Sequence, residues 1–404
     1  MKLSFLPKLR LQVWILAGGR LRSQIGTGFI LFYAPIFFVE EVGLSATLVG
    51  LALGSASISG VIGRFLGGQW ADSQFWGRRK ILLLSAAISA LADVFLLIAN
   101  DFPLLVLGNL LMGLGVGFYW PATEAAVTDL TKVEERNEAF AVTRLADSLG
   151  LSLGVILGGA LITQSGNYRA LFALDGLTFI GFFSLIYFFV PETYQFTGTI
   201  AKSSPGWLVA WRDRRLMIYV VVNILFTTYI AQVQTTLPVY FKSHIGEAGF
   251  SPGVISGLFT WHIVLAALLQ LPIARWLNRY SRIFSLSISM ILWGLGFILL
   301  SLAGLFSQYA LIWAIISLSV FALAMIIYTP AASAFVADIA PVSLRGVYQA
   351  INSQCWAVGY LIAPPLGGWA LDLDIAEGFF LALSSSVILG IFVLRYLKFL
   401  LTKS

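Results

Sequence analysis

The chain has 404 residues, of which 59% are hydrophobic and only 11% are charged. Soluble domains carry about 25% charged residues, so this composition excludes a soluble globular protein and indicates a multi-pass membrane protein. The net charge of +6 does not predict a nucleic-acid partner, because the basic residues lie in short loops between apolar segments. One cysteine and two histidines exclude a disulfide framework and predict neither a metal site nor a cofactor.

Twelve segments are long and apolar enough to cross a bilayer, which takes about 20 residues per helix. They are predicted at 13–38, 46–70, 80–99, 104–128, 138–163 and 169–190, and then at 216–241, 252–277, 283–304, 308–336, 345–370 and 376–399. The first segment is interpreted as an uncleaved span, because no small-residue cleavage site interrupts it. An even number of spans places both termini on the same side.

The basic residues predict which side that is. If both termini are cytoplasmic, only Arg169 and Lys242 of the 25 lysines and arginines lie in outer loops. The positive-inside rule therefore predicts cytoplasmic termini. Short loops and the lack of an Asn-x-Ser/Thr sequence favour the inner (plasma) membrane of a bacterium, where the protein is expected to be a monomer in the lipid bilayer.

The longest polar stretch, residues 192–215, divides the chain into two similar halves, residues 1–191 and 216–404. Shifting the sequence by 209 positions aligns "YWPATEAAVTDL" with "YTPAASAFVADI", and the register continues without a gap to Gly159 and Gly368. Internal repeats of six helices are typical of secondary transporters, whose substrate site lies between the repeats. We therefore predict two pseudo-symmetric six-helix bundles joined by a cytoplasmic linker.

The loop after the second predicted span, "GGQWADSQFWGRRK", resembles the loop signature of the major facilitator superfamily. The matching residue types are Gly68, Ala71, Asp72, Gly77, Arg78, Arg79 and Lys80, whereas Ser73 stands where an arginine is common. The resemblance covers nearly the whole chain and implies an all-α membrane protein with twelve transmembrane helices, the major facilitator fold, that transports by alternating access.

The same resemblance implies a cytoplasmic gate. Asp72 is expected to face the start of the eleventh span near Arg345, and Arg79 is expected to pair with Asp129. The alternative interpretation is an ordinary basic loop that only sets the topology.

The fifth predicted span contains "GLSLGVILGG", which is similar to the glycine pattern of drug:proton antiporters. Gly150, Gly154, Gly158 and Gly159 match the pattern, and Val155 replaces its proline. The pattern favours export over uptake, although such glycine faces also serve general close packing of helices. Asn109 stands where related exporters often carry an arginine, so their coupling mechanism does not transfer directly.

Ionisable residues inside the spans are confined to the first half. Arg64, Glu124, Arg144 and Asp147 are predicted to share the inner part of the bilayer, and the repeat places no charges at the positions equivalent to the last three. Desolvation favours a neutral acid, whereas a nearby arginine favours the ionised form. We therefore predict Asp147 as the main coupling acid, Arg144 or Arg64 as the switch and Glu124 as a second proton site. A permanently ionised structural pair is the alternative.

The superfamily resemblance implies a cavity lined by the first, fourth, seventh and tenth spans. Its candidate lining residues are Gln24, Tyr33, Asn109, Tyr119, Trp120, Gln232, Gln234 and Tyr328. Such a wall suits small lipophilic or amphipathic substrates, so the leading hypothesis is proton-coupled export. The alternatives are a proton-coupled symporter for nutrient uptake and a non-transporting sensor or lipid scramblase. The sequence contains no nucleotide-binding loop, metal cluster or nucleophile arrangement that would predict an enzyme.

Overall fold

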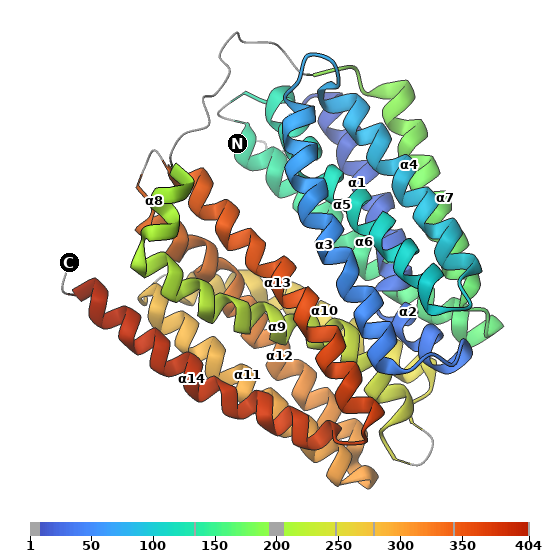
Figure 1. Ribbon diagram of the computed structural model, residues 1–404, viewed down its shortest axis with the longest axis vertical. Helices are drawn as coiled ribbons and strands as arrows, with labels where there is room; N and C mark the ends of the chain where they lie inside the picture. Colours follow the sequence, from blue (N-terminus) through green and yellow to red (C-terminus); the bar gives the residue numbers. More distant parts are fainter. Residues whose placement is uncertain are drawn as a thin grey trace, which may run out of the picture. The chain divides into compact units, whose positions relative to one another are not determined.

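The computed structural model describes residues 9–132, 135–193, 206–246, 249–277, 279–341 and 344–402, and all of its regular elements are helical (Figure 1). The long helices are α1 (Leu11–Leu31), α3 (Ala46–Ala71), α4 (Gly77–Ile98), α5 (Phe102–Leu130), α6 (Arg136–Ser165), α7 (Arg169–Phe189), α9 (Arg214–Ser243), α10 (Pro252–Leu277), α11 (Arg282–Leu305), α12 (Ala310–Ile339), α13 (Arg345–Asp372) and α14 (Ala376–Thr402). The short elements are α2 (Tyr33–Ile36), a π-helical turn (Phe37–Glu41), α8 (Gly206–Arg212) and a 3₁₀ turn (Ser307–Tyr309).

Each of the twelve predicted spans corresponds to one long helix. Eleven helical segments of the described chain are long and apolar enough to cross a membrane. The remaining helix, α13, is 28 residues long but carries polar residues such as Asn352, Ser353 and Gln354 on one turn. The first segment runs from Leu11 to Glu41 and is interrupted near Pro35, because proline lacks the amide hydrogen that continues an α-helix.

The chain divides into two compact units, and each is described by itself. The first comprises Met1–Leu44 and Ser55–Gly198, and the second comprises Ser45–Gly54 and Thr199–Ser404. In the first unit, α1 packs against α6 and α7, and α4 packs against α5 and α7. Of the expected linker, residues 194–205 lie outside the described residues, and α8 follows them.

The second unit repeats the helix pairs of the first. Helix α9 packs against α13, and α11 packs against α12 and α14. The repeat also extends to atomic contacts: a Cβ atom at Gly359 of α13 would lie 2.5 Å from the Thr227 hydroxyl of α9. Gly359 is the repeat equivalent of Gly150, which packs equally closely against α1.

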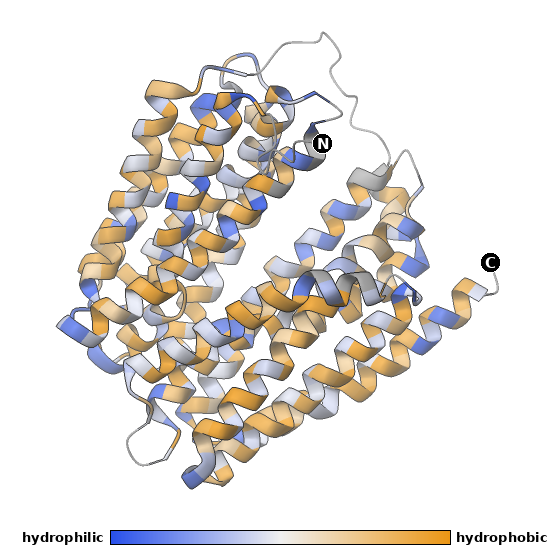
Figure 2. Cartoon of the chain, turned by 180° about the vertical axis from the view of Figure 1, so that it is seen from behind, coloured by the Kyte–Doolittle hydropathy of each residue, from blue (hydrophilic) through white to orange (hydrophobic). Residues whose placement is uncertain are grey.

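Hydrophobic residues cover most of the helix surfaces, whereas hydrophilic residues concentrate at helix ends and in connecting segments (Figure 2). Many large apolar side chains are exposed, including Phe65, Ile98, Phe188 and Leu268. Water would disfavour so much exposed apolar surface, but lipid tails would not. This is the surface expected of a membrane protein.

Candidate functional site

Helices α1 and α6 meet through glycines in the first unit. A Cβ atom at Gly150 would lie 2.3 Å from the carbonyl oxygen of Leu21, and one at Gly154 would lie 2.1 Å from that of Ile25. On the opposite side, a Cβ at Gly28 would lie 2.8 Å from the Gly154 Cα. Because no side chain fits at these positions, the glycines set how closely the two backbones approach.

The predicted glycine face continues along α6. A Cβ atom at Gly158 would lie 3.1 Å from the ring of Tyr33, and Gly159 is also buried. The face therefore packs along α1 and the short helix that follows it.

A buried ion pair joins the same two helices. The Arg20 Nε donates to Asp147 Oδ1 at 2.9 Å, and Nη2 donates to Oδ2 at 2.5 Å. The Arg20 side chain is fully buried, and that of Asp147 is 17% exposed. Such two-pronged contact between a guanidinium and a carboxylate is the strongest form of this ion pair. Arg20 thus neutralises Asp147 inside the helix bundle.

The glycines position this pair. Asp147 precedes Gly150 by three residues and Gly154 by seven, and Arg20 precedes Gly28 by eight. These spacings place each charged residue on the glycine-lined face of its own helix. The close approach of the backbones therefore brings the guanidinium within reach of the carboxylate.

Other polar groups surround the pair. The Arg20 guanidinium lies over the Trp120 ring at 5.2 Å from its centroid, and the buried Arg20 Nη1 has no hydrogen-bond partner among the described residues. Arg144 and Glu124 form a second ion pair at 3.6 Å, with exposed side-chain fractions of 70% and 38%. The first unit therefore contains two ion pairs that share one turn of α6. The pair of Arg20 and Asp147 is buried, and the pair of Arg144 and Glu124 is more exposed.

These contacts correct the predicted charge arrangement. The partner of Asp147 in this structure is Arg20, whereas Arg144 pairs with Glu124, so a switching role of Arg144 or Arg64 stays a prediction. Arg64 is partly buried on α3, and no ion pair or hydrogen bond of its side chain occurs among the described residues. The depth of each charge along its span did not identify Arg20 as the partner of Asp147, because the pairing depends on which faces of α1 and α6 meet.

The loop between α3 and α4 is organised by Arg78. This side chain is 11% exposed and contacts three acceptors: the Ala71 carbonyl oxygen at 2.5 Å, the carboxylate of Asp72, and Asp129 Oδ2 at 3.1 Å. The expected pairing of Arg79 with Asp129 is wrong, because Arg79 donates to the Tyr187 carbonyl oxygen at 2.6 Å instead.

The same loop depends on Gly77. Its φ of +70° lies in the left-handed region, and a Cβ atom there would lie 2.4 Å from the Glu192 carboxylate. That carboxylate accepts hydrogen bonds from the amides of Arg78 and Arg79 at 2.9 and 3.1 Å. A carboxylate at the start of α4 also complements the positive end of the helix dipole.

Gly68 of the predicted gate is less closely packed than Gly77. A Cβ atom at Gly68 would come no closer than 4.0 Å to Pro121. The Arg345 side chain lies outside the described residues, so the proposed gate contact of Asp72 with the start of α13 stays a prediction.

The second unit repeats one of these ion pairs. Arg282 at the start of α11 approaches Asp338 near the end of α12 at 3.5 Å, as Arg78 at the start of α4 approaches Asp129 near the end of α5. Arg282 and Asp338 are more exposed, at 40% and 62%. The internal repeat thus preserves an ion pair but not its burial.

The residues predicted to line a cavity take part in contacts within their own units. Tyr33, Asn109, Gln232 and Tyr328 are buried and form hydrogen bonds there, and Tyr360 donates to the partly buried Gln234. Gln24 lies against Gly150, and Tyr119 contacts the Trp120 ring edge-on. Their role in substrate binding stays a prediction.

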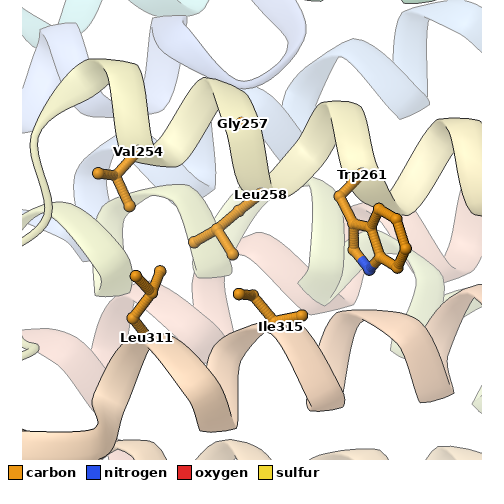
Figure 3. Close-up of a pocket in the computed structure, with 6 residues that line it drawn as sticks. All are labelled: Val254, Gly257, Leu258, Trp261, Leu311 and Ile315. Atoms are coloured by element: carbon orange, nitrogen blue, oxygen red, sulfur yellow. The ribbon is translucent and has the colours of Figure 1, made fainter.

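An apolar groove of about 460 Å³ lies between α10 and α12 (Figure 3). It is lined by Val254, Gly257, Leu258, Trp261, Leu311 and Ile315. The Trp261 indole N–H is already engaged, because its Nε1 donates to the Ser319 hydroxyl at 2.8 Å. Because no other polar side-chain group occurs among these described lining residues, the groove is apolar surface of the kind that lipid tails cover.

Comparison with known proteins identifies the type of molecule. The family model described as Major Facilitator Superfamily matches residues 16–248 and 241–402. A Na(+), Li(+), K(+)/H(+) antiporter of Planococcus maritimus is 25% identical over 83% of this chain and 85% of its own length. Multidrug resistance protein MdtH of Sodalis glossinidius is 28% identical over 84% of this chain and 80% of its own length.

Solved structures agree on the fold. A nucleoside transporter, NupG, superposes with a TM-score of 0.80 at 14% identity and covers 96% of this chain and 99% of its own. A peptide transporter, POT, in complex with sulfate superposes with a TM-score of 0.79 at 14% identity and covers 97% and 96%.

Proposed function

We propose, because the chain belongs to the Major Facilitator Superfamily, that this membrane transporter exports small lipophilic or amphipathic molecules in exchange for protons. The superfamily assignment makes it a transporter and not an enzyme. The multidrug resistance proteins and the cation/proton antiporter among its relatives support the finer proposal.

The observation that carries proton coupling is the buried pair of Arg20 and Asp147. Charged residues inside a membrane are costly and are therefore usually functional. An adjacent guanidinium favours an ionised carboxylate, whereas a buried carboxyl group without that partner favours the neutral acid. Separation of α1 from α6 by a small distance would thus remove the guanidinium that balances the charge of Asp147.

The proposed cycle moves one proton and one guanidinium. With the pair closed, Asp147 is ionised and holds no proton. When Asp147 takes up a proton, the attraction to Arg20 is lost, and the guanidinium can lean further towards the Trp120 ring or towards Glu124. Arg144 then competes with Arg20 for Glu124, which links the two ion pairs.

We further propose that the chain lies in a bacterial inner membrane with both termini in the cytoplasm. The uneven distribution of lysine and arginine supports this orientation. In that orientation the loop between α3 and α4 is cytoplasmic, and Asp72 would take part in the cytoplasmic gate.

The test is ethidium uptake into everted membrane vesicles from cells that lack their own efflux pumps. We expect uptake when the vesicle interior is acidified, and its loss when a protonophore is added. Asp147→Asn should lower this pH-driven uptake about tenfold, because the substituted amide cannot exchange a proton with the gradient. Exchange of ethidium without a gradient should persist.

A matched control is Glu138→Gln, which neutralises an exposed carboxylate on the same helix. This variant should transport like the wild type. Normal pH-driven uptake by Asp147→Asn would remove Asp147 from the mechanism. Uptake by the wild type that is insensitive to the protonophore would refute proton coupling.

Exchange of monovalent cations for protons is a second candidate, favoured by the printed activity of the Planococcus relative. The same acidified vesicles distinguish it: addition of Na⁺, Li⁺ or K⁺ should then release luminal protons in the absence of ethidium.

A further inference from the structure

Two carboxyl groups lie buried in the first unit, away from the ion pairs described above. Asp93 of α4 is 2% exposed and Asp175 of α7 is fully buried. A Cβ atom at Gly176 would lie 3.4 Å from the Asp93 Cβ, so the Asp93 side chain rests against α7 beside Asp175. The two carboxyl groups are close enough to repel each other when both are ionised.

Their oxygen atoms have few partners. Both carboxyl oxygens of Asp93 and the Oδ2 of Asp175 are buried without a hydrogen bond among the described residues. The remaining oxygen, Asp175 Oδ1, lies 3.3 Å from the Thr178 hydroxyl, which also donates to the Asp175 carbonyl oxygen at 2.8 Å. The pair is therefore almost unsolvated.

Within the described part of the chain, no basic side chain of the packed helices forms an ion pair with them. On α1, Arg20 is bound to Asp147, and Arg22 lies against Gly181, six residues beyond Asp175 on α7. On α7 itself, Arg169 donates to the Leu97 and Ala99 carbonyl oxygens and to Asn100.

The other charged residues of these helices lie elsewhere. Arg78, Arg79 and Lys80 are at the first turn of α4, at the opposite end from Asp93. The acids of α5, Glu124 and Asp129, contact Arg144 and Arg78. Two ionised carboxylates cannot share such an environment, so at least one holds a proton.

Helix α1 connects these acids with the coupling pair. A Cβ atom at Gly26 would lie 1.9 Å from Asp175 Oδ1, so the α1 backbone rests directly on this carboxyl group. Six residues earlier, α1 carries Arg20, which holds Asp147. Any change in charge or hydrogen bonding at Asp175 therefore acts on the helix that also positions the Arg20 guanidinium.

We propose that Asp93 and Asp175 form a further proton-binding site, a carboxyl pair that keeps one shared proton and takes up and releases another during transport. The proposal rests on the proposed function and extends it to carboxyl groups outside the Arg20–Asp147 pair. Uptake of the second proton leaves the pair neutral, and its release leaves a single negative charge that α1 must accommodate. The two proton sites then communicate through α1.

Infrared spectroscopy of the full-length protein in lipid vesicles tests proton binding without relying on transport. The wild type at neutral pH should show the C=O band of a buried protonated carboxyl group, shifted in D₂O. The band should disappear in Asp93→Asn/Asp175→Asn and persist in Asp147→Asn and in Asp374→Asn, the last being an exposed control. Absence of the band in the wild type would overturn the proposal, with no variant required.

Proton exchange during transport is tested with the same variants. Asp93→Asn/Asp175→Asn should bind ethidium within about twofold of the wild type but release about one proton fewer per protein on binding, and its pH-driven uptake should fall about tenfold. Unchanged proton release and uptake would make the pair purely structural. If the wild type fails to move ethidium but shows the band, only the proposed substrate class is wrong.

Discussion

Arg20 is the residue for which burial and pairing oppose each other most strongly. Its guanidinium is fully buried, which disfavours a charge, yet it donates two hydrogen bonds to Asp147 and lies over the Trp120 ring. Breaking a buried ion pair costs about 3–5 kcal/mol because one charge remains uncompensated, whereas replacing both partners by apolar residues is often neutral. This asymmetry separates the structural role of the pair from its role in transport.

The single variant Arg20→Met and the double variant Arg20→Met/Asp147→Leu should therefore differ in stability but not in transport. Arg20→Met should destabilise the protein by about 3 kcal/mol, at the lower end because Asp147 retains 17% exposure. Arg20→Met/Asp147→Leu should recover most of the stability and still lack pH-driven ethidium uptake. Thermal unfolding of the purified proteins and vesicle transport measure the two effects. If Arg20→Met had the melting temperature of the wild type, the Arg20–Asp147 ion pair would not be closed in the membrane.

The sequence analysis named Asp147 as a candidate coupling acid but did not identify Arg20 as its ion-pair partner, for a physical reason. Depth along a helix can be counted from the sequence, but the partner of a charge depends on which helix faces meet. A usable signal existed: Arg20, Gln24 and Gly28 recur at four-residue spacing, as Asp147, Gly150 and Gly154 do at three and four. If both patterns had been interpreted as the two sides of one helix interface, the ion pair of Arg20 and Asp147 would have been predicted.

At the scale of the helices, the α1–α6 interface is built from backbone contacts. Helix boundaries were predictable to within a few residues, because apolar length defines a span. The neighbours of each helix were not, except where glycines indicate close approach. Gly28 against Gly154 is one such contact.

Gly154→Ala should push α6 away from α1. A methyl group would lie 2.1 Å from the Ile25 carbonyl oxygen, and overpacking of this kind costs about 1–3 kcal/mol. We expect a lower melting temperature and weaker pH-driven uptake, because the Arg20–Asp147 distance lengthens. Gly18→Ala is the matched control, since nothing lies within 4 Å of a Cβ there and alanine favours the helix by about 1 kcal/mol. Equal effects at both positions would contradict the packing argument.

At the scale of the whole molecule, the two halves share helix pairs and glycine contacts but differ in their charges. Trp356, the repeat equivalent of Asp147, lies among Tyr328 and Tyr360 with no charged partner in the described part of the second unit. The repeat thus supplies a common scaffold, and among the described residues the first half alone carries the buried ion pair that we propose to exchange protons. Fold and repeat could be predicted from sequence, because both depend on patterns that span many residues.

The repeated loop ion pairs allow this asymmetry to be tested. Arg78 is 11% exposed and contacts Asp72, Asp129 and the Ala71 carbonyl oxygen, whereas Arg282 is 40% exposed and contacts Asp338 alone among the described residues. Arg78→Gln removes the positive charge and the forked donor that join these three acceptors, so pH-driven ethidium uptake should fall about tenfold. Arg282→Gln removes an exposed pair worth about 0–1 kcal/mol, so uptake should change less than about twofold. Ethidium uptake by the two variants, measured at matched expression, tests this prediction. Equal losses of uptake would mean that both loops, rather than the first alone, control the transport cycle.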